Sequence, residues 1–521
     1  MSDKKVKDND VPEKRSQNLN GELRKKRTEL TSGQRLYTYV IAIIASLASL
    51  QYGYNTTVFS AGLDPISKEF GIKKLKNVTT TDGSESEEYE TDTLMQGFLV
   101  TTVLIGGLIG ALTSGMIADK IGRERTLIID EIISLISCLG CALTPWLWLL
   151  IVSRIVLGLA AGAASVIVPL FVVEIAPSQI RGGVGVLSQL LLTIGIFFAY
   201  ASGTGFLKIP EKYGWRCMLG LPIIFSIIHL VLSLVFFRVE SPKWLLLVND
   251  EEKAKKMLQK LRRTDDIEDE LEELEADIGR SDAEDEPSYK ELFMNLITPV
   301  LPIVLATGLL FWQQITGINA VLYYLATFFV DAGMDEDIAN YMSMVVGFIN
   351  VVMTIVNIVV IDKLGRKPLL LISLTGMIIM HAVISIADLF VNNTTAAGYI
   401  CAAATILFVM AFAIGLGACP WPIINELFPS QTRALASSAA LTVQWITNIV
   451  VTLVFPVLID AVDMGYVFCG FGVLSVAALV FVAILLPETK NKSVDEIIAS
   501  MKRSRNENGK EEEMTSIEED G

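Results

Sequence analysis

The chain contains 521 residues, of which 52% are hydrophobic and 19% are charged, with a formal net charge of −15 at pH 7. Soluble globular proteins carry about 25% charged residues, and the mean hydropathy here is +0.51, so the composition excludes a soluble globular fold and predicts a membrane protein. The negative charge lies mainly in polar segments at 265–277, 284–286 and 511–520, which excludes nucleic acid as a partner.

Twelve apolar runs follow one another along the chain, each near the ~20 residues that a helix needs to cross a bilayer. The first run follows a long polar tail and has no small-residue cleavage site, so we interpret it as an anchor and not as a signal peptide. The prediction is an all-α polytopic membrane protein with spans at 37–61, 94–118, 126–146, 148–173, 184–204, 216–237, 299–324, 339–361, 369–390, 398–423, 436–460 and 465–486.

Three motifs occur twice, in the same order. Residues 174–182 (EIAPSQIRG) are echoed by 426–434 (ELFPSQTRA), residues 119–125 by 362–367, and residues 240–243 by 488–490. Duplicated halves around a cleft are how secondary transporters achieve alternating access, so we expect two pseudo-symmetric six-helix halves. The predicted organisation is a cytosolic tail 1–36, a first half 37–237, an intracellular helical loop 238–294, a second half 295–487 and a cytosolic tail 488–521.

The distribution of basic residues predicts the topology. They gather in the N-terminal tail and in the short loops that contain Arg123, Arg181, Arg366 and Arg433. The positive-inside rule places this side, with both termini, in the cytosol. The acidic loop 62–93 and the loop near Asn392 then lie on the lumenal or extracellular side, and the sequons at Asn77 and Asn392 predict a glycoprotein.

The loop 238–294 is polar and prone to form helices. Apolar residues spaced at i, i+3 and i+4 from Ile267 to Leu274 predict short amphipathic helices packed under the membrane domain. For its most acidic part, 276–288, a flexible charged linker is the alternative.

Cysteine and histidine residues do not form a metal-ligand pattern. Four of the six cysteines and both histidines lie within predicted spans: Cys138, Cys141, Cys401, Cys419, His229 and His381. Their spacing is not typical of a metal site, so we expect no metal and no cofactor. Nor does the chain cluster nucleophile and base residues at one depth, and we expect no enzymatic activity.

Charged residues at the cytosolic ends of the spans predict a gate. Acidic and basic residues face one another across tight turns, and the arrangement is repeated in both halves. A network of such pairs that forms in one state and breaks in another can bias a conformational equilibrium, although the same charges would also serve only to fix topology. The predicted network comprises Asp119, Arg123, Arg125, Glu174, Arg181, Glu240, Asp362, Arg366, Glu426, Arg433 and Glu488.

An ordered set of motifs runs through the spans and their loops: G115xxxD119KxG122R123, R154xxxG158, P169LFxxE174xxPxxxR181G182, E240SPK243, Q313QxxGxNxxxYY324 and P487ETK490. With these motifs the sequence resembles the sugar porter branch of the major facilitator superfamily, over roughly residues 37–500. Phe171 stands where the family usually has Tyr. The resemblance implies a twelve-helix rocker fold and a hexose or polyol substrate.

The spans also contain the residue types that a sugar site requires. Amides donate and accept hydrogen bonds as sugar hydroxyls do, and aromatic rings cover the C–H faces of the sugar. The candidate substrate-binding residues are Gln189, Gln313, Gln314, Asn319, Asn350, Trp421, Trp445 and Asn448. For each amide the alternative role is an interhelical hydrogen bond. The resemblance implies sugar contact for the first six, and an extracellular gate for Tyr323 and Tyr324, with Gly317 allowing the helix to bend.

Two positions differ from animal glucose carriers, which usually have Glu where Ala413 stands and Asn where Gln444 stands. Loss of a carboxylate acceptor removes one strong hydrogen bond. This weakens an assignment to glucose and leaves another hexose or a polyol as alternatives.

The residue at the position that couples sugar transport to protons also differs from that of proton-coupled relatives. Proton-coupled sugar porters typically place Asp in the first span, facing the Arg of the fourth span, whereas here Asn55 faces Arg154. Asn does not titrate, so we predict facilitated diffusion. Asp130, Glu131 and Asp388 are alternative proton carriers, but Asp130 and Glu131 are predicted to be partners of the cytosolic arginines.

The expected function is therefore alternating-access transport of a monosaccharide, with glucose the first choice among hexoses. The alternatives are a proton-coupled sugar or polyol (inositol) symporter and a sugar sensor that does not transport. We expect a multi-pass protein of the plasma membrane, with a vacuolar or other internal membrane as the alternative. Its partners are the sugar and the bilayer, and a monomer is sufficient.

Overall fold

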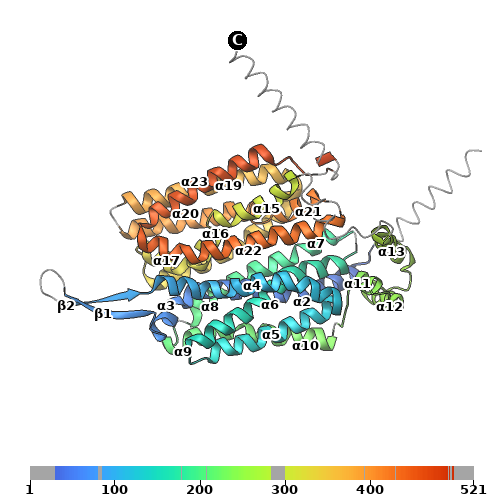
Figure 1. Ribbon diagram of the computed structural model, residues 1–521, viewed down its shortest axis with the longest axis horizontal. Helices are drawn as coiled ribbons and strands as arrows, with labels where there is room; N and C mark the ends of the chain where they lie inside the picture. The colour runs from blue at the N-terminus through green and yellow to red at the C-terminus, as the bar shows by residue number, and fades with distance from the viewer. Residues whose placement is uncertain are drawn as a thin grey trace, which may run out of the picture.

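A computed structural model describes residues 30–79, 85–177, 179–206, 208–236, 238–282, 300–391, 394–428, 430–490, 492 and 496–497. Within this part of the chain, twelve helices are long and apolar enough to cross a membrane, which confirms the predicted number. Figure 1 shows them running side by side in two groups, with the first half of the chain in blue and green and the second half in yellow to red.

The first half begins with α2 and ends in a short π-helical turn, η1. Its bounds are α2 Ser32–Thr57, α4 Thr93–Ile121, α5 Arg123–Leu143, α6 Leu147–Ile175, α7 Arg181–Gly185, α8 Leu187–Phe206, α9 Glu211–Gly220, α10 Pro222–Val231 and η1 Leu232–Phe236. The membrane-spanning helices consist mostly of apolar residues. Helix α5 also carries the buried polar residues Asp130, Glu131 and Ser134.

The second half repeats the order with more interruptions. Its bounds are α15 Val300–Ile315, α16 Ile318–Tyr323, α17 Leu325–Asp331, α18 Glu336–Leu364, α19 Arg366–Phe390, α20 Thr394–Ile414, α21 Pro420–Leu427, α22 Ser430–Ala461 and α23 Met464–Leu485. The predicted tenth span, 398–423, is too long, because α20 ends at Ile414 and the turn that follows leads into α21.

One end of the bundle carries a β-hairpin, and we call it the hairpin end (Figure 1). The predicted acidic loop 62–93 is here mostly regular structure: α3 Phe59–Glu69 is followed by β1 Lys73–Thr79 and β2 Glu85–Thr91. The strands pair antiparallel, with Lys73 opposite Thr91. The sequon residue Asn77 lies in β1, whereas Asn392 lies outside the described residues.

The opposite end carries α11 Pro242–Leu247, α12 Glu251–Arg262 and α13 Glu268–Asp282, and we call it the α11–α13 end. These are the short helices expected in 238–294, and the proposed linker lies partly in α13 and partly outside the described residues. Arg262 is buried and fastens them to the bundle: its guanidinium donates to the Ile175 carbonyl at 3.0 Å and pairs with Glu270 at 2.6 Å.

Helices α4 and α6 pack closely along their length, and glycines permit this approach. A Cβ placed on Gly158 would lie 2.2 Å from the backbone oxygen of Val103, and one on Gly106 would lie 1.9 Å from that of Ile155. Small residues allow membrane helices to approach in this way, so that packing replaces the hydrophobic force that lipid does not supply.

Replacing Gly158 by Ala is therefore expected to destabilise the protein, because the added methyl group meets backbone and no flexible side chain can yield. We expect a loss of ~1–3 kcal/mol, the range for overpacking, visible as a lower melting temperature in detergent. Gly115→Ala on α4 is the matched control, since nothing lies within 4 Å of the added Cβ. Equal melting temperatures for the two variants would contradict this account of the α4–α6 contact.

Candidate functional site

The seventh span is broken in the middle, as the predicted bend at Gly317 requires. Gly317 has φ +89°, a conformation that suits glycine, and it separates α15 from α16. Gln313 and Gln314 lie just before the break and Asn319 just after it. The break therefore places three amide side chains at one depth inside the second half.

These amides form a hydrogen-bonded chain. Asn319 Nδ2 donates to Gln314 Oε1, and Gln314 Nε2 donates to Gln313 Oε1 at 3.1 Å. Gln313 Nε2 donates in turn to the Leu416 carbonyl at 2.8 Å. Gln444 of α22 joins from the side, donating to Gln313 Oε1 at 3.3 Å. Because each amide keeps both donor and acceptor atoms, the chain can exchange an internal bond for one to a hydroxyl group.

Gln444 is absent from the predicted set, although its position was recognised as a departure from glucose carriers. Its Oε1 atom is buried and makes no hydrogen bond to the described residues. An unsatisfied buried acceptor is costly, and a hydroxyl donor would relieve that cost. We therefore include Gln444 in the candidate site, because it contacts Gln313 and has a free acceptor.

A second polar cluster lies beside the chain on α16 and α22. Asn448 donates to the Tyr323 hydroxyl at 3.3 Å and accepts from Thr452 at 3.1 Å, while the Tyr324 hydroxyl donates to the Thr452 carbonyl at 3.0 Å. Both tyrosines are buried. The predicted gate residues thus contact α22 of their own half.

An aromatic pair connects the halves at this level. The ring of Trp445 on α22 lies 5.8 Å from that of Tyr52 on α2, measured between centroids. Tyr52 was not predicted as a site residue, since an aromatic residue in a span is usually only packed. The pair gives the amide chain an apolar wall built from both halves.

The other predicted binding residues are more dispersed. Gln189 on α8 is half-buried, and Asn350 on α18 is buried. Trp421 is half-buried on α21, not in the tenth span where it was predicted, because α20 ends seven residues earlier. The described hydrogen bonds join Gln313, Gln314 and Asn319 in one chain, which does not extend to Gln189 or Asn350.

The two halves meet at the hairpin end. The Tyr200 hydroxyl donates to the Leu322 carbonyl at 2.6 Å, the Ser60 hydroxyl accepts from the Ala326 amide at 3.1 Å, and Thr204 donates to the Asn340 carbonyl at 3.3 Å. Each bond crosses from one half to the other. This end of the bundle is therefore closed over the candidate site.

At the α11–α13 end, the charged residues pair within each half. Arg123 binds Glu174 at 3.1 Å and Asp119 at 3.0 Å. Glu240 accepts from the backbone amides of Arg123 at 2.9 Å and Glu124 at 3.2 Å, at the first turn of α5. The carboxylate thus satisfies amides at a helix N-terminus that have no partner within the helix.

The second half repeats this arrangement. Arg366 binds Glu426 at 2.9 Å, and Glu488 accepts from the backbone amides of Arg366 at 3.1 Å and Lys367 at 3.0 Å. The glycine that precedes each arginine has a positive φ, +102° at Gly122 and +91° at Gly365. The duplicated motifs of the sequence are therefore two copies of one structural device.

The two capping carboxylates differ in their environment. Burial raises the pKa of Glu240, even though it accepts three backbone hydrogen bonds. Burial also acts on Glu488, but backbone hydrogen bonds from Lys490, Arg366 and Lys367 outweigh it, so its pKa lies below the ordinary value. The device of the second half therefore keeps its charge to lower pH.

Not all predicted gate residues pair as the spacing suggests. Glu174 binds Arg123, and Arg181 is exposed on α7. Arg125 is exposed on α5. The side chains of Asp362 and Arg433 lie outside what the structure describes.

Arg154 is fully buried and faces Asn55, as predicted. Its Nη1 donates to the Asn55 backbone carbonyl at 2.9 Å, and its guanidinium lies 3.9 Å from the ring centroid of Phe59. Its Nε and Nη2 atoms make no hydrogen bond to the described residues. A carbonyl and an aromatic face stabilise the cation in place of a contacting carboxylate.

The prediction that Asp130 and Glu131 are partners of the cytosolic arginines is wrong for Glu131. Its carboxylate accepts from Gln51 Nε2 at 2.7 Å and lies 2.6 Å from His229 Nδ1. Glu131 is eight residues into α5, more than two turns from Arg123, which places it in the interior of the first half. Among the described residues no group of three potential metal ligands occurs.

Comparison with known proteins identifies the family to which this chain belongs. The family model described as "Sugar (and other) transporter" matches residues 41–500, and the chain belongs to this family, the sugar porters of the major facilitator superfamily. The glucose transporter GlcP of Staphylococcus epidermidis is 35% identical over 88% of this chain and 96% of its own length. The D-xylose transporter of Levilactobacillus brevis is 32% identical over 92% of this chain and 99% of its own length.

Solved structures of sugar transporters are similar to this one in fold. The partially occluded inward-open conformation of the xylose transporter XylE from E. coli matches with a TM-score of 0.73 at 26% identity, over 88% of this chain and 99% of XylE. XylE is described as a proton:xylose symporter in its complex with 6-bromo-6-deoxy-D-glucose, which matches with a TM-score of 0.72. The protein is thus a sugar transporter that works by alternating access, and not an enzyme.

The closed hairpin end leads to a prediction about Tyr200. Tyr200→Phe removes the hydroxyl that bridges to the Leu322 carbonyl, a loss of ~1 kcal/mol or about fivefold in the equilibrium between closed and open forms. We expect longer distances between spin labels on α3 and α17 by electron–electron resonance.

The matched control is Tyr54→Phe. The Tyr54 hydroxyl bonds to Ser202 and to the Met218 carbonyl, both in its own half. An equal shift of the label distances in the two variants would show that the Tyr200 bond does not hold the hairpin end closed.

Proposed function

We propose that this protein transports a neutral hexose, with glucose the first substrate to test, by facilitated diffusion. The observation that carries the substrate class is the amide chain of Asn319, Gln314, Gln313 and Gln444 at the break in the seventh span. Its members are uncharged, and each offers a donor and an acceptor to a hydroxyl. The pair of Trp445 and Tyr52 adds an apolar face for the sugar ring.

The relatives support a monosaccharide, because GlcP is a glucose transporter and the Levilactobacillus brevis protein a D-xylose transporter. Ala413 and Gln444 distinguish this chain from animal glucose carriers, so another hexose or a polyol such as inositol is the second choice. The buried, unpaired Oε1 of Gln444 favours a substrate that places a hydroxyl donor beside α22.

The coupling proposal rests on Asn55. The cation of Arg154 is held by a backbone carbonyl and by Phe59, neither of which titrates. Uptake of a proton at Asn55 therefore cannot make or break an ion pair with Arg154. XylE is a proton:xylose symporter, so proton symport is the alternative that the comparison favours, and it would need an acid elsewhere.

We place the α11–α13 end in the cytosol, because the basic residues gather there. The hairpin end then faces outward, and the closed arrangement is an inward-facing or occluded state. Asn77 on β1 lies on the outward side in this orientation, as glycosylation would require. The plasma membrane is the proposed location, and the monomer contains the whole site.

Asn350→Ala should weaken sugar affinity about fivefold, the effect of losing one hydrogen bond of ~1 kcal/mol, with normal expression. Equilibrium binding of radiolabelled glucose to purified protein measures it. The control on the same helix is Asn357→Ala, whose amide donates to the Ile414 carbonyl at 2.6 Å and so has a structural role. Unchanged affinity for Asn350→Ala would remove this residue from the site.

Facilitated diffusion predicts that glucose uptake into proteoliposomes reaches equilibrium without accumulation, with or without an inward proton gradient. Asn55→Asp should create sensitivity to the gradient, because it supplies a titratable partner close to Arg154. Unlabelled fructose, galactose and inositol compete in the same assay to define the substrate. Gradient-driven accumulation by the unmodified protein would favour the symporter, and binding without uptake would favour a sensor.

A further inference from the structure

We propose that Glu131 and His229 form a proton-binding site inside the first half, which sets the rate of sugar transport according to the pH at the α11–α13 end and carries no proton across. The site is separate from Asn55 and Arg154. The inference rests on the proposed function, since it assigns a control to the same transport cycle.

The pair is the centre of a buried junction of three helices. Glu131 of α5 contacts His229 Nδ1 of α10 at 2.6 Å and accepts from Gln51 Nε2 of α2 at 2.7 Å. Gln51 Oε1 accepts from Ser134 and Ser226, both at 2.8 Å. Glu131 and His229 can share a proton at this contact, and the second ring nitrogen of His229 offers a further position for a proton.

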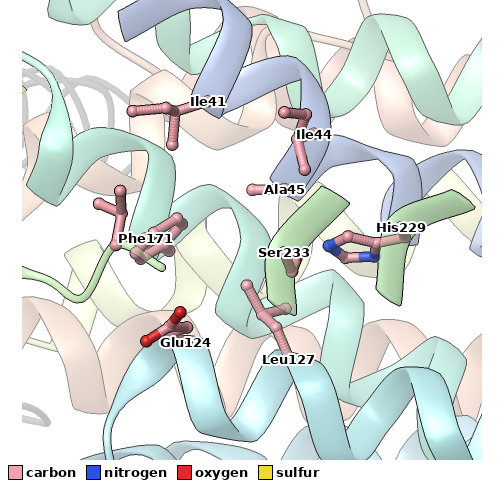
Figure 2. Close-up of a pocket in the computed structure, with 9 residues that line it drawn as sticks. Ile41, Ile44, Ala45, Glu124, Leu127, Phe171, His229 and Ser233 are labelled. Carbon is pink, nitrogen blue, oxygen red and sulfur yellow. The ribbon is translucent and has the colours of Figure 1, made fainter. Parts of the chain in front are cut away.

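His229 borders a cavity that extends toward the α11–α13 end. The cavity has a volume of about 30 Å³, enough for a water molecule, and Glu124 and Val239 line its far side. Figure 2 shows the imidazole of His229 beside Ser233 at one side of the cavity and the carboxylate of Glu124 at another. Because Glu124 is in the first turn of α5, this cavity gives protons a route from that end.

Toward the hairpin end the route is blocked. Arg154, Phe59, Cys138 and Cys141 are all fully buried there. The cation of Arg154 adds an electrostatic barrier, as positive groups do in pores that exclude protons. Because His229 borders the cavity that leads to the α11–α13 end, the pair senses the pH at that end, whereas proton coupling would require access from both ends in turn.

The junction also contacts the candidate sugar site. A second, smaller space is lined by Glu131, Gln51, Tyr52 and Asn55. Tyr52 follows Gln51 on α2, and its ring contacts Trp445 of the opposite half. A change in the bond from Glu131 to Gln51 therefore acts on the helix that forms the wall between the halves.

The titratable groups around the pair come from every helix packed against it. On α5 these are Asp130 and Cys138, the latter under the influence of both Glu131 and Arg154. Helix α6 contributes Arg154, α2 contributes Tyr52 and Tyr54, and Glu124 of α5 lines the same cavity as His229. Of these, Asp130 and Glu124 are the competing proton acceptors, and the experiment must separate them from the pair.

The titration is measured directly because the chain has two histidines. In purified protein labelled with nitrogen-15 histidine, we expect one ring signal to titrate and to vanish in His229→Gln. Glu131→Gln should alter this signal, because it removes the carboxyl group that contacts His229 Nδ1 at 2.6 Å. A His229 signal that does not titrate between pH 5 and 8 would overturn the proposal, and this readout does not depend on transport.

Transport is then measured as glucose exchange in sealed vesicles of both orientations, with the pH varied on one side at a time. We expect the rate to change about fivefold with pH at the α11–α13 end, the difference between a neutral and a charge-assisted hydrogen bond, and to be constant with pH at the hairpin end. Glu131→Gln and His229→Gln should flatten the profile. Asp388→Asn, an acid that binds the Gly465 amide near the hairpin end, should keep it.

Equal sensitivity at both ends, or a profile that persists in both Glu131→Gln and His229→Gln, would overturn the assignment. So would a profile that Asp130→Asn or Glu124→Gln abolishes and His229→Gln leaves intact. Absence of glucose exchange at every pH, together with a titrating His229, would refute the proposed substrate and leave the proton site standing.

Discussion

Inside a bilayer, polar groups must be satisfied by the protein itself, because lipid offers no hydrogen bonds, and this constraint organises the molecule. Within a helix, the backbone N–H and C=O groups bond to one another. The polar groups that need another partner are therefore those at the start of a helix, at a break in a helix and on polar side chains. At the start of α5 and of α19, the carboxylates of Glu240 and Glu488 accept the free backbone amides. At the break beside Gly317, three amide side chains satisfy one another.

Duplication explains where these features lie, but the two halves have become different. Both keep the glycine with a positive φ, the arginine that follows it and the capping glutamate. Only the first half, within the described residues, has a carboxylate bonded to a histidine at mid-depth. The interior of the second half has the neutral amide chain instead. The two halves therefore share the device at their helix turns and differ in their polar interiors.

Much of the fold could be predicted because its signals are local. Length and apolarity determined the number of spans, and the repeated motifs gave the two halves. The failures have physical causes. The hairpin of β1 and β2 is formed from polar residues without an apolar period, and the turn after Ile414 contains Gly415 and Gly417, whose effect on a long apolar run is hard to foresee.

The candidate site also has a part that local sequence signals predict and a part that they do not. Residues that belong to a motif, such as Gln313 and Gln314, could be proposed as sugar ligands from the sequence, and Asn55 could be placed beside Arg154. Gln444, Tyr52 and the partners of Glu131 were missed, because their roles depend on contacts between helices far apart in the sequence. Glu131 and Gln51 are 80 residues apart, and no periodicity brings them together. Only the packing of α2 against α5 and α10 does so.

The separation of charge from substrate has a mechanistic consequence. A neutral sugar gains little from a buried charge, and a desolvated ion in the cleft would have to be paired again in every state of the cycle. Arg154 and Glu131 lie within the first half, where their partners move with them as one body. The amide chain can break and re-form its bonds at a cost near that of one hydrogen bond. Rocking of the halves therefore rearranges neutral contacts, such as the bond from Tyr200 to Leu322, whereas Arg154 and Glu131 have their partners within one half.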